Sequence, residues 1–531
     1  MTTSDHKKMA LCRAWRVLRI AALSLMVFIA ACAGKDATPA HAGFNRTSVE
    51  RLFAVGYQDI KEIYIQEIGL RTLALTGLSQ LESIDPALDL RHTQRTLTLR
   101  YRNSRRSFAL PRTKDGNDWA NLTADVLQTA RGYSKAVMDT GMSQVYKTVF
   151  DGIMARLDRF SRYASAEKAQ ENRAQRDGFG GIGVRVKRRQ KGIEILDVME
   201  SSPAARAGLH QGDMIVAVNG HPATQLAKGG TTALRGPIDS KVRLTVERAA
   251  DDTAIRMAIK RARIVPQTVS YSRRKGTLYL RINGFNQRTA DAVRKAIERA
   301  KSEMGPDLVG YILDLRNNPG GLLDQAVAVS DVFLAKGRVV STRGRHPDSH
   351  QYFDAQPGDG AEARPVAVLV NTNSASAAEI VAAAIQDSGR GLVLGSTSYG
   401  KGTVQTVLRL PNDGELTLTW ARFHAPSGYA LSHRGVVPNV CTSLIESGTV
   451  DTLLTAVRHG KLAPHEKQPP TAAGDEAGTS AQESHQACPA NGETTTETVA
   501  LAEHLLNHSD LYRAARNGEP ARVARAYTDR Q

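Results

Sequence analysis

The chain has 531 residues, of which 41% are hydrophobic and only 5% aromatic, and its net charge is +17. A chain of this length exceeds one hydrophobic core and should form about two to four domains. The basic residues are scattered and are not interleaved with aromatic side chains. Composition therefore argues against a nucleic-acid-binding protein and favours a basic surface that is solvated or meets anionic lipid or cell wall.

The first 31 residues have the pattern of a secretory signal. Basic side chains between positions 7 and 19 precede an apolar run at 20–31, which is too short to span a bilayer. The run ends in Ile-Ala-Ala-Cys at positions 29–32, which resembles a bacterial lipobox. The resemblance implies that residues 1–31 are removed and that Cys32 carries lipid.

Residues 32–47 are then a tether to the folded protein. Ala33, the residue after the lipidated cysteine, favours the outer membrane of a Gram-negative bacterium as the destination, on its periplasmic side. The alternative is an ordinary signal peptide cleaved near Ala31 or Ala42. In both cases we expect the protein to leave the cytoplasm.

Residues 48–177 are expected to form a mainly helical domain. Within it, the alternating string LTLRYRNSRRSFAL at 97–110 predicts a β-hairpin.

Residues 178–263 are expected to form a β-rich domain. Its first turn is rich in glycine, and ILDVMESSPAARAGLHQGDMIVAVNG supplies a strand, short helix and strand. Together these features resemble a PDZ domain. We expect the turn to cradle a C-terminal carboxylate with its N–H groups, and the next strand to pair with the bound peptide. A plain hairpin turn would look similar. The residues of this loop are Gly180, Gly181, Ile182 and Gly183.

Residues 264–445 alternate short apolar strands with helical segments. The strings GTLYLRI, VGYILDLR, PVAVLVN and GLVLG are separated by amphipathic stretches. This pattern predicts an α/β sheet with crossover helices.

The chemistry is expected between residues 371 and 405. Ser376 precedes a helix-forming run, and Glu379 follows three residues later, so a capping box is one interpretation of this serine. Lys401 stands between two glycines and covers no apolar face. A desolvated lysine amine can act as the base that activates a serine hydroxyl. In an extended chain Gln405 would share a face with Lys401 and could hold its amine.

The backbone N–H of Ala377, at the helix start, is expected to stabilise an oxyanion. A Ser/His/Asp arrangement is the competing interpretation. His424 and His433 lie in the following region, but no motif links either of them to Ser376.

Four strings occur in order in the second half of the chain: GYILDLRNNPGGLL (310–323), NSASAAEIVAAAIQD (373–387), YGKGTVQT (399–406) and APSGYALSHRGVVPN (425–439). Together they resemble the carboxyl-terminal processing proteases, which are serine endopeptidases with a Ser/Lys dyad, an embedded PDZ domain and a crotonase- or ClpP-like core. The resemblance implies that Ser376 is the nucleophile, Lys401 the base and Gln405 the residue that orients the lysine. It also implies that the N–H of Gly320 is the second oxyanion donor.

One segment departs from the family pattern. The usual G-M-L-x-x-L-D-P-H-x-x-Y appears as GIMARLDRFSRY at 152–163, with Arg159 and Phe160 in place of Pro-His.

Residues 446–531 are expected to be a linker and a C-terminal tail. Cys441 and Cys488 are an even pair in an oxidising compartment, so a disulfide between them is expected. Residues 498–512 predict one amphipathic helix, which could dock on the protein itself or on a partner. No Cys/His spacing predicts a metal, and no cofactor is implied.

The sequence as a whole predicts an endopeptidase that cleaves periplasmic proteins whose C-termini bind the PDZ domain. An adaptor lipoprotein, self-association and membrane attachment by the lipid anchor are further expectations, and nucleic acid is not expected as a partner. The alternative is a PDZ scaffold, non-catalytic or gated by an adaptor, that recruits cell-wall enzymes at the outer membrane.

Overall fold

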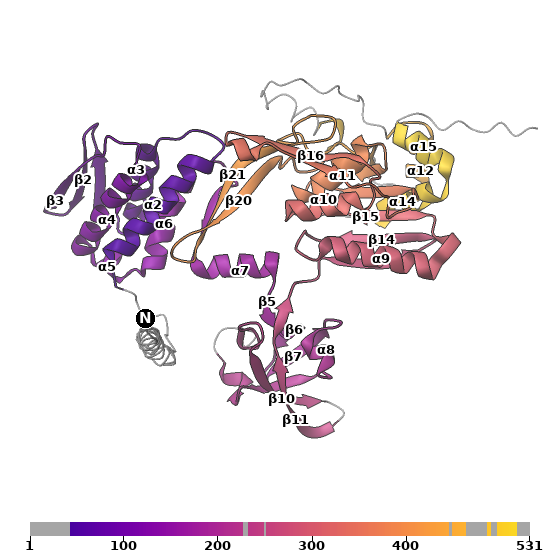
Figure 1. Ribbon diagram of the computed structural model, residues 1–531, viewed down its shortest axis with the longest axis horizontal. Helices are drawn as coiled ribbons and strands as arrows, with labels where there is room; N and C mark the ends of the chain where they lie inside the picture. The colour runs from indigo at the N-terminus through magenta and orange to yellow at the C-terminus, as the bar shows by residue number, and fades with distance from the viewer. Residues whose placement is uncertain are drawn as a thin grey trace, which may run out of the picture.

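A computed structural model describes residues 43–226, 232–248, 251–444, 449–462, 486–489 and 496–517. Figure 1 shows a helical region, a small β-rich domain and a larger mixed core. The predicted signal segment, Cys32 and most of the tether lie outside the described residues. Within the described ranges, no helix is both long and apolar enough to cross a membrane.

The N-terminal region is a helical bundle with a small sheet at one end. Its first helix begins at a good cap, because the Asn45 side chain accepts a hydrogen bond from the N–H of Ser48. Buried residues then recur at helical spacing, including Leu52, Phe53 and Tyr57. The helices of the bundle are α2 (Arg46–Ile63), α3 (Leu70–Ser79), α4 (Gly116–Tyr133), α5 (Lys135–Asp139) and α6 (Met142–Met154), with the 3-10 turn η1 (Gln80–Ser83). Helix α7 (Ala166–Asp177) lies apart from the bundle and leads to the β-rich domain (Figure 1).

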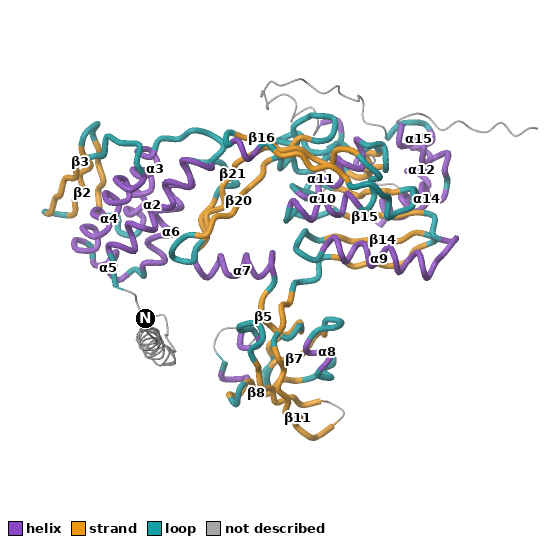
Figure 2. Tube along the Cα trace, in the orientation of Figure 1, coloured by secondary structure: helices purple, strands orange, loops and turns teal. Residues whose placement is uncertain are grey.

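The expected hairpin is present and belongs to a three-stranded antiparallel sheet. Strands β1 (Leu88–His92), β2 (Thr96–Tyr101) and β3 (Ser104–Ala109) lie in sequence order. Leu97, Leu99 and Phe108 are buried, so one face of the sheet packs on the helices. Figure 2 places this sheet at the end of the molecule that is remote from the mixed core.

The β-rich domain matches the expected PDZ arrangement of strands and a short helix. Its main sheet has the order β11-β10-β8-β7-β6, which leaves β6 at an edge, and β5 pairs separately with β12. The elements are β5 (Phe179–Gly181), β6 (Val184–Arg188), β7 (Ile193–Val198), α8 (Pro203–Arg206), β8 (Met214–Val218), β9 (His221–Pro222), η2 (Ala223–Gln225), η3 (Thr232–Leu234), β10 (Lys241–Arg248), β11 (Asp251–Lys260) and β12 (Ala262–Ile264). Strands β5 and β12 connect it to the rest of the chain (Figure 1).

The core is a three-layer α/β/α structure around the sheet β13-β14-β15-β18-β19-β22. Along β15, Tyr311 and Leu313 pack in one apolar cluster with α9, α10 and α11, whereas Ile312 packs in the other cluster. This alternation covers both faces of the sheet, whose strands are parallel except for β13 at one edge. The elements are β13 (Val269–Arg274), β14 (Thr277–Ile282), α9 (Thr289–Met304), η4 (Gly305–Asp307), β15 (Gly310–Asp314), α10 (Leu323–Asp331), β18 (Val366–Val370), α11 (Ala377–Asp387), β19 (Leu392–Gly395) and β22 (Val440–Cys441).

A second sheet joins the core to the helical region. Its order is β17-β16-β21-β20, and the short strand β4 (Arg162–Ala164) pairs with β21. Leu410, Leu416 and Leu418 are buried in the apolar core of the helical region. The second sheet is therefore anchored in the helical region at one end and reaches the core at the other. The other elements are β16 (Gly337–Gly344), η5 (Pro347–Ser349), β17 (Gln351–Ala355), β20 (Thr403–Arg409) and β21 (Glu415–His424).

The C-terminal segment packs on the protein itself. After the short turn η6 (Thr442–Leu444), helices α12 (Val450–Arg458), α14 (Thr496–Asn507) and α15 (Ser509–Asn517) follow. Leu453, Leu501 and Leu505 lie in the apolar cluster on the second face of the core sheet. The single helix expected at 498–512 is thus two helices, and its docking on the protein answers the alternative that the sequence left open. These helices extend the core beyond the expected boundary at residue 445.

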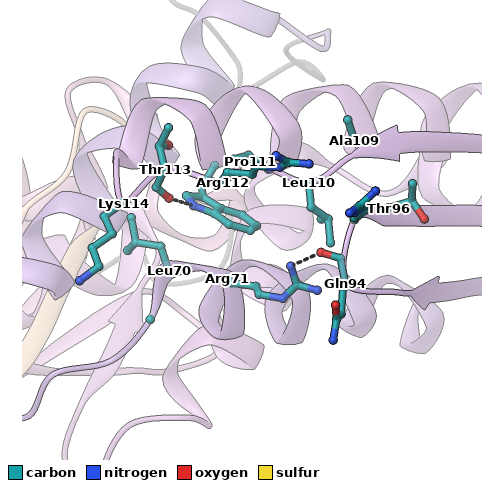
Figure 3. A pocket seen from close by; sticks show the side chains of 13 residues that line it. Leu70, Arg71, Gln94, Thr96, Ala109, Leu110, Pro111, Arg112, Thr113 and Lys114 are labelled. Atoms are coloured by element: carbon teal, nitrogen blue, oxygen red, sulfur yellow. Dashed lines mark hydrogen bonds between the residues drawn. The ribbon is translucent and has the colours of Figure 1, made fainter.

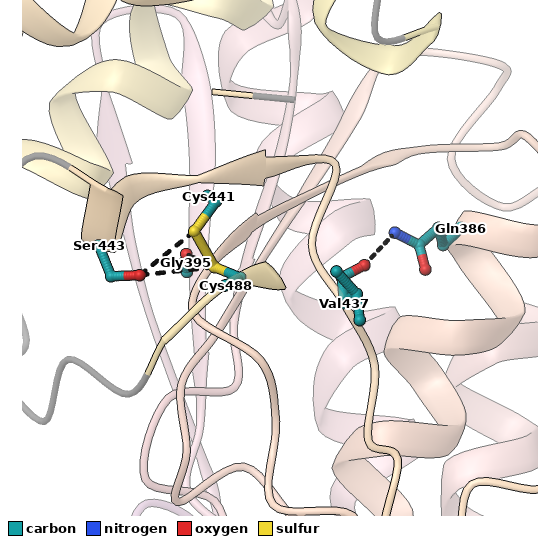
Figure 4. The surroundings of a disulfide bond; sticks show 6 residues. All are labelled: Gln386, Gly395, Val437, Cys441, Ser443 and Cys488. Carbon is teal, nitrogen blue, oxygen red and sulfur yellow. Dashed lines mark hydrogen bonds between the residues drawn. A yellow bond between two sulfur atoms is a disulfide. The ribbon is translucent and has the colours of Figure 1, made fainter. Parts of the chain in front are cut away.

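A disulfide joins Cys441 to Cys488 (Figure 4). The Cys488 carbonyl accepts a hydrogen bond from the N–H of Thr397 at 3.3 Å. The disulfide therefore holds a piece of the tail against the loop that leads from β19 to Lys401.

Candidate active site

Ser376 lies at the N-terminus of α11 in a backbone conformation that is unusual for serine. Its φ is 57° and its ψ is −116°, and only 8% of its surface is exposed. Non-glycine residues with positive φ are uncommon and concentrate at functional sites. Gly320 packs directly against it, because a Cβ atom at Gly320 would lie 2.8 Å from Ser376 Cβ and 2.7 Å from the Ala375 oxygen. Only glycine fits at position 320 without a shift of the backbone.

Glu379 connects the serine to the loop of the lysine. Its Oε2 accepts hydrogen bonds from the backbone N–H of Ser376 at 2.7 Å and of Lys401 at 2.9 Å. Its Oε1 accepts from the N–H of Gly400 at 2.7 Å and from the hydroxyl of Ser398 at 2.6 Å. The side chain is fully buried. Burial raises the pKa of Glu379, and the four hydrogen bonds act in the opposite direction.

This arrangement brings Ser376 and Lys401 together from different elements. Because one oxygen atom binds both backbone N–H groups, the start of α11 and the loop before β20 are neighbours in space. The sequence indicated Glu379 only as a partner of Ser376 in a capping box. Its bonds to the lysine loop were missed, because they join residues about twenty positions apart that no local pattern links.

The net effect of the surroundings of Lys401 is to lower its pKa. Its Nζ lies 5.2 Å from the centroid of the Phe160 ring. Burial lowers the pKa of the Lys401 ammonium group below its ordinary value, and the positive charge of Arg162 lowers it further, whereas Glu379 and Asp158 act in the opposite direction. A lysine with a lowered pKa is a stronger candidate for a general base near neutral pH.

Phe160 and Arg162 come from the segment that departs from the family pattern. The structure therefore places part of the helical region around the lysine, which sequence reasoning had not assigned to the site. Arg159, the other departing residue, lies over the rings of Phe160 and Tyr399, with its Cζ 4.7 Å and 5.4 Å from their centroids. The alignment of residues 152–163 with the family motif was the signal that could have found this contact.

The expected bond between Gln405 and Lys401 is replaced by other contacts. The Gln405 amide donates to the Thr403 hydroxyl at 2.8 Å and to the Thr419 hydroxyl at 3.3 Å. The pairing of β20 with β21 shifts register between Val404 and Gln405. A bulge interrupts the regular alternation of side chains. The role of Gln405 in orienting Lys401 stays a prediction.

The two N–H groups expected to bind the oxyanion, those of Ala377 and Gly320, differ in their hydrogen bonding. Ala377 is the first residue of α11, and the first N–H groups of a helix have no partner within it. The N–H of Gly320, in contrast, donates to Oδ1 of Asn318 at 2.8 Å. Asn318 is itself fixed, because its Nδ2 donates to the Ile282 carbonyl at 2.7 Å. The Gly320 N–H therefore has a partner other than the expected oxyanion.

The expected carboxylate loop of the PDZ domain is partly strand. Gly180 and Gly181 belong to β5 and pair with β12, and only the residues after them form the turn into β6. The Ile182 and Gly183 carbonyls accept backbone hydrogen bonds from Ala204 at 2.8 Å and Met199 at 2.9 Å. These bonds fix the turn beside the free edge of β6, where an extended peptide could add as a strand.

Comparison with known proteins identifies two domains in this chain. The model of peptidase family S41 matches residues 276–442, and the model of the PDZ domain matches residues 180–259. A carboxy-terminal-processing protease of Bartonella bacilliformis is 37% identical over 319 residues, which cover 60% of this chain and 73% of that protein. A probable CtpA-like serine protease of Staphylococcus epidermidis is 32% identical over 305 residues, or 56% of this chain and 60% of that protein.

Similar solved structures include a photosystem II D1 C-terminal processing protease, which is 23% identical with a TM-score of 0.37 and covers 74% of this chain and 92% of that one. The PDZ domain of a carboxy-terminal protease from Vibrio cholerae, in complex with peptide, is 26% identical with a TM-score of 0.15 and covers 16% of this chain and 96% of that one.

The fold and the matched domains define a serine-type peptidase with an embedded PDZ domain. The chain belongs to the carboxy-terminal-processing proteases of peptidase family S41. Across the described residues, no group of three or more His, Cys, Asp or Glu side chains is arranged to hold a metal ion.

Proposed function

We propose that Ser376 and Lys401 form the catalytic dyad of this peptidase. The observation that carries the proposal is the Glu379 carboxylate, which binds the backbone of both residues within 3 Å. The lowered pKa of Lys401 supports its role as the base. The strained backbone of Ser376 and its position at a helix start support its role as the nucleophile.

The reaction then proceeds through an acyl-enzyme. Neutral Lys401 accepts the proton of the Ser376 hydroxyl as its oxygen attacks the peptide carbonyl. The Ala377 N–H stabilises the oxyanion. Lys401 next protonates the leaving amine. In the second half of the reaction, Lys401 accepts a proton from a water molecule that attacks the acyl carbonyl, and it then protonates the Ser376 oxygen as the acyl group leaves.

The second oxyanion donor requires a local change. For the Gly320 N–H to bind an oxyanion, it must leave Asn318, to which it is bonded at 2.8 Å. This contact favours an enzyme that is gated, by substrate or by an adaptor, over one that is always active. The non-catalytic scaffold is less well supported, because both dyad residues are present and connected.

The substrate is a protein whose C-terminus binds the PDZ domain at the edge of β6. Binding an end remote from the scissile bond positions an extended chain for cleavage. We further propose that the protein is exported, carries lipid on Cys32 and faces the periplasm from the outer membrane. An adaptor lipoprotein and self-association belong to the same proposal.

The test uses the chain from Gly43 onwards, which retains every described element. An unstructured protein with an apolar C-terminus and its C-terminally amidated twin are offered to the wild-type and Ser376→Ala enzymes. The proposal predicts cleavage that depends on Ser376 and that falls with the amide. Equal cleavage of both substrates would refute recognition of the carboxylate, and cleavage by Ser376→Ala would refute the nucleophile.

A further inference from the structure

The sheet β1–β3 carries a concentration of positive charge far from the active site. Between Leu88 and Lys114 there are eight basic residues and one acidic residue, Asp89. All eight are exposed. Within the described residues, only Arg91 of this set forms an ion pair, and its partner is Asp89. The set is Arg91, Arg95, Arg100, Arg102, Arg105, Arg106, Arg112 and Lys114.

Two of these arginines are direct neighbours on the face that points away from the helices. Leu99 is buried on the helical side, so the alternation of the strand turns Arg100 outward. In the register of β2 and β3, Arg100 is opposite Arg105. Like charges that are directly opposite in a sheet destabilise it. On the neighbouring strand β1, Asp89 is the residue opposite Arg100, but the Asp89 carboxylate binds Arg91 at 3.0 Å.

Hydroxyl groups complete this outer face. Thr98 is opposite Ser107, and their oxygens lie 3.0 Å apart. Arginine and hydroxyl donors together suit the oxygens of phosphate groups, which accept several hydrogen bonds and neutralise positive charge. An external anion would thus relieve a repulsion that Asp89, which also pairs with Arg91, offsets only in part.

The basic character continues into a cavity beside the sheet. This cavity has a volume of about 650 Å³, and Arg95, Arg112 and Lys114 are among its lining residues (Figure 3). Arg71 holds its wall by donating to the carbonyls of Gln94 at 2.9 Å and Thr93 at 2.6 Å. Cations therefore surround more than one side of the sheet.

We infer that the outer face of β1–β3 binds the anionic phospholipid surface of a membrane. The charge is spread over a sheet face and its margin, which fits a surface of many phosphates better than a single ligand. Position also favours a membrane, an argument that rests on the proposed lipid anchor. Gly43 is eleven residues after Cys32, so the tether between them can span at most roughly 40 Å. A lipid on Cys32 would thus keep the folded protein close to the membrane surface.

The test omits the anchor and therefore does not depend on Cys32. The chain from Gly43 onwards is sedimented with vesicles of phosphatidylcholine, alone or mixed with phosphatidylglycerol. We expect binding only to the anionic vesicles, and weaker binding as salt rises. Each arginine near an anionic surface strengthens binding about fivefold, so Arg100→Gln with Arg105→Gln should weaken it about 25-fold.

The matched control removes the same charge from the protease core, by Arg288→Gln with Lys295→Gln, and should leave vesicle binding nearly unchanged. Arg105→Glu changes the charge by the same two units and should weaken binding to a similar extent. It should also raise the melting temperature, because the new carboxylate pairs with Arg100, so a folding defect cannot explain the weaker binding. The inference would be overturned by equal binding to neutral and anionic vesicles, or by equal effects of the two double variants. It would also be overturned if the protein bound polyglutamate but not the anionic vesicles. Proteolysis in solution should not change, which separates this result from the proposed function.

Discussion

Glu379, in helix α11, accepts a hydrogen bond from the backbone N–H of Lys401 at 2.9 Å. The same oxygen accepts the N–H of Ser376 at 2.7 Å. One buried carboxylate thus holds the proposed nucleophile and the proposed base in fixed relation, without touching the reacting atom of either. Glu379 is in this account a positioning residue.

Glu379→Gln should lower both activity and stability. An amide presents one oxygen and one NH₂ group to four donors, so some buried donors lose their acceptor, at a cost of about 1–3 kcal/mol for each group left unsatisfied. Thermal unfolding should show a lower melting temperature, and kcat should fall while KM changes little. Wild-type kcat in a folded Glu379→Gln enzyme would contradict this role.

The pH profile should report the pKa of Lys401. Since the base must be neutral, kcat/KM should rise with pH through a pKa below the ordinary lysine value of 10.5, because burial and the charge of Arg162 lower it. Arg162→Gln removes one of these causes and should shift the rising limb to higher pH. Arg156→Gln, an exposed arginine nearby, serves as the control and should leave the profile unchanged.

Gln405→Ala should have a smaller effect than Lys401→Ala. Its amide binds Thr403 and Thr419 rather than the lysine, so the substitution removes support for the strand and leaves the base in place. The loss of about one net hydrogen bond should lower the free energy of unfolding by roughly 1 kcal/mol and leave most of kcat in place. Steady-state kinetics that show both variants equally inactive would restore the direct contact that the sequence suggested.

Loss of the disulfide should destabilise the protein and loosen the loop before Lys401. The two cysteines are 47 positions apart, and the chain-entropy model gives about 4 kcal/mol for a loop of that length. Urea unfolding of the double variant Cys441→Ser, Cys488→Ser should show a lower midpoint than the oxidised protein. A reductant should lower the midpoint of the wild type and leave that of the double variant unchanged.

Much of the architecture could be predicted because it depends on local pattern. The alternation of apolar strands and helices indicated the core, and the glycines and strand–helix–strand string indicated the PDZ domain. The start of a helix at Ser376 followed from the residues next to it. Such features are encoded within about ten to twenty positions, which is the range over which periodicity and caps act.

The remainder depends on contacts between distant segments. The bonds of Glu379 to Ser398 and Gly400, the ring of Phe160 near Lys401 and the bond of Asn318 to Gly320 arise only after the elements pack. The bulge before Gln405 shifts the pairing register of its strand, although the strand itself was expected. The docking of α14 likewise required the second face of the core sheet, which the sequence does not display.

The most direct test of the account is the rate at which an unfolded protein substrate is cleaved by the wild-type, Ser376→Ala and Lys401→Ala enzymes, each shown by its melting curve to be folded. The account predicts that both variants lose cleavage to the background level, because nucleophile and base act as one unit. Cleavage that survives either substitution at a rate close to that of the wild type would contradict the Ser/Lys dyad.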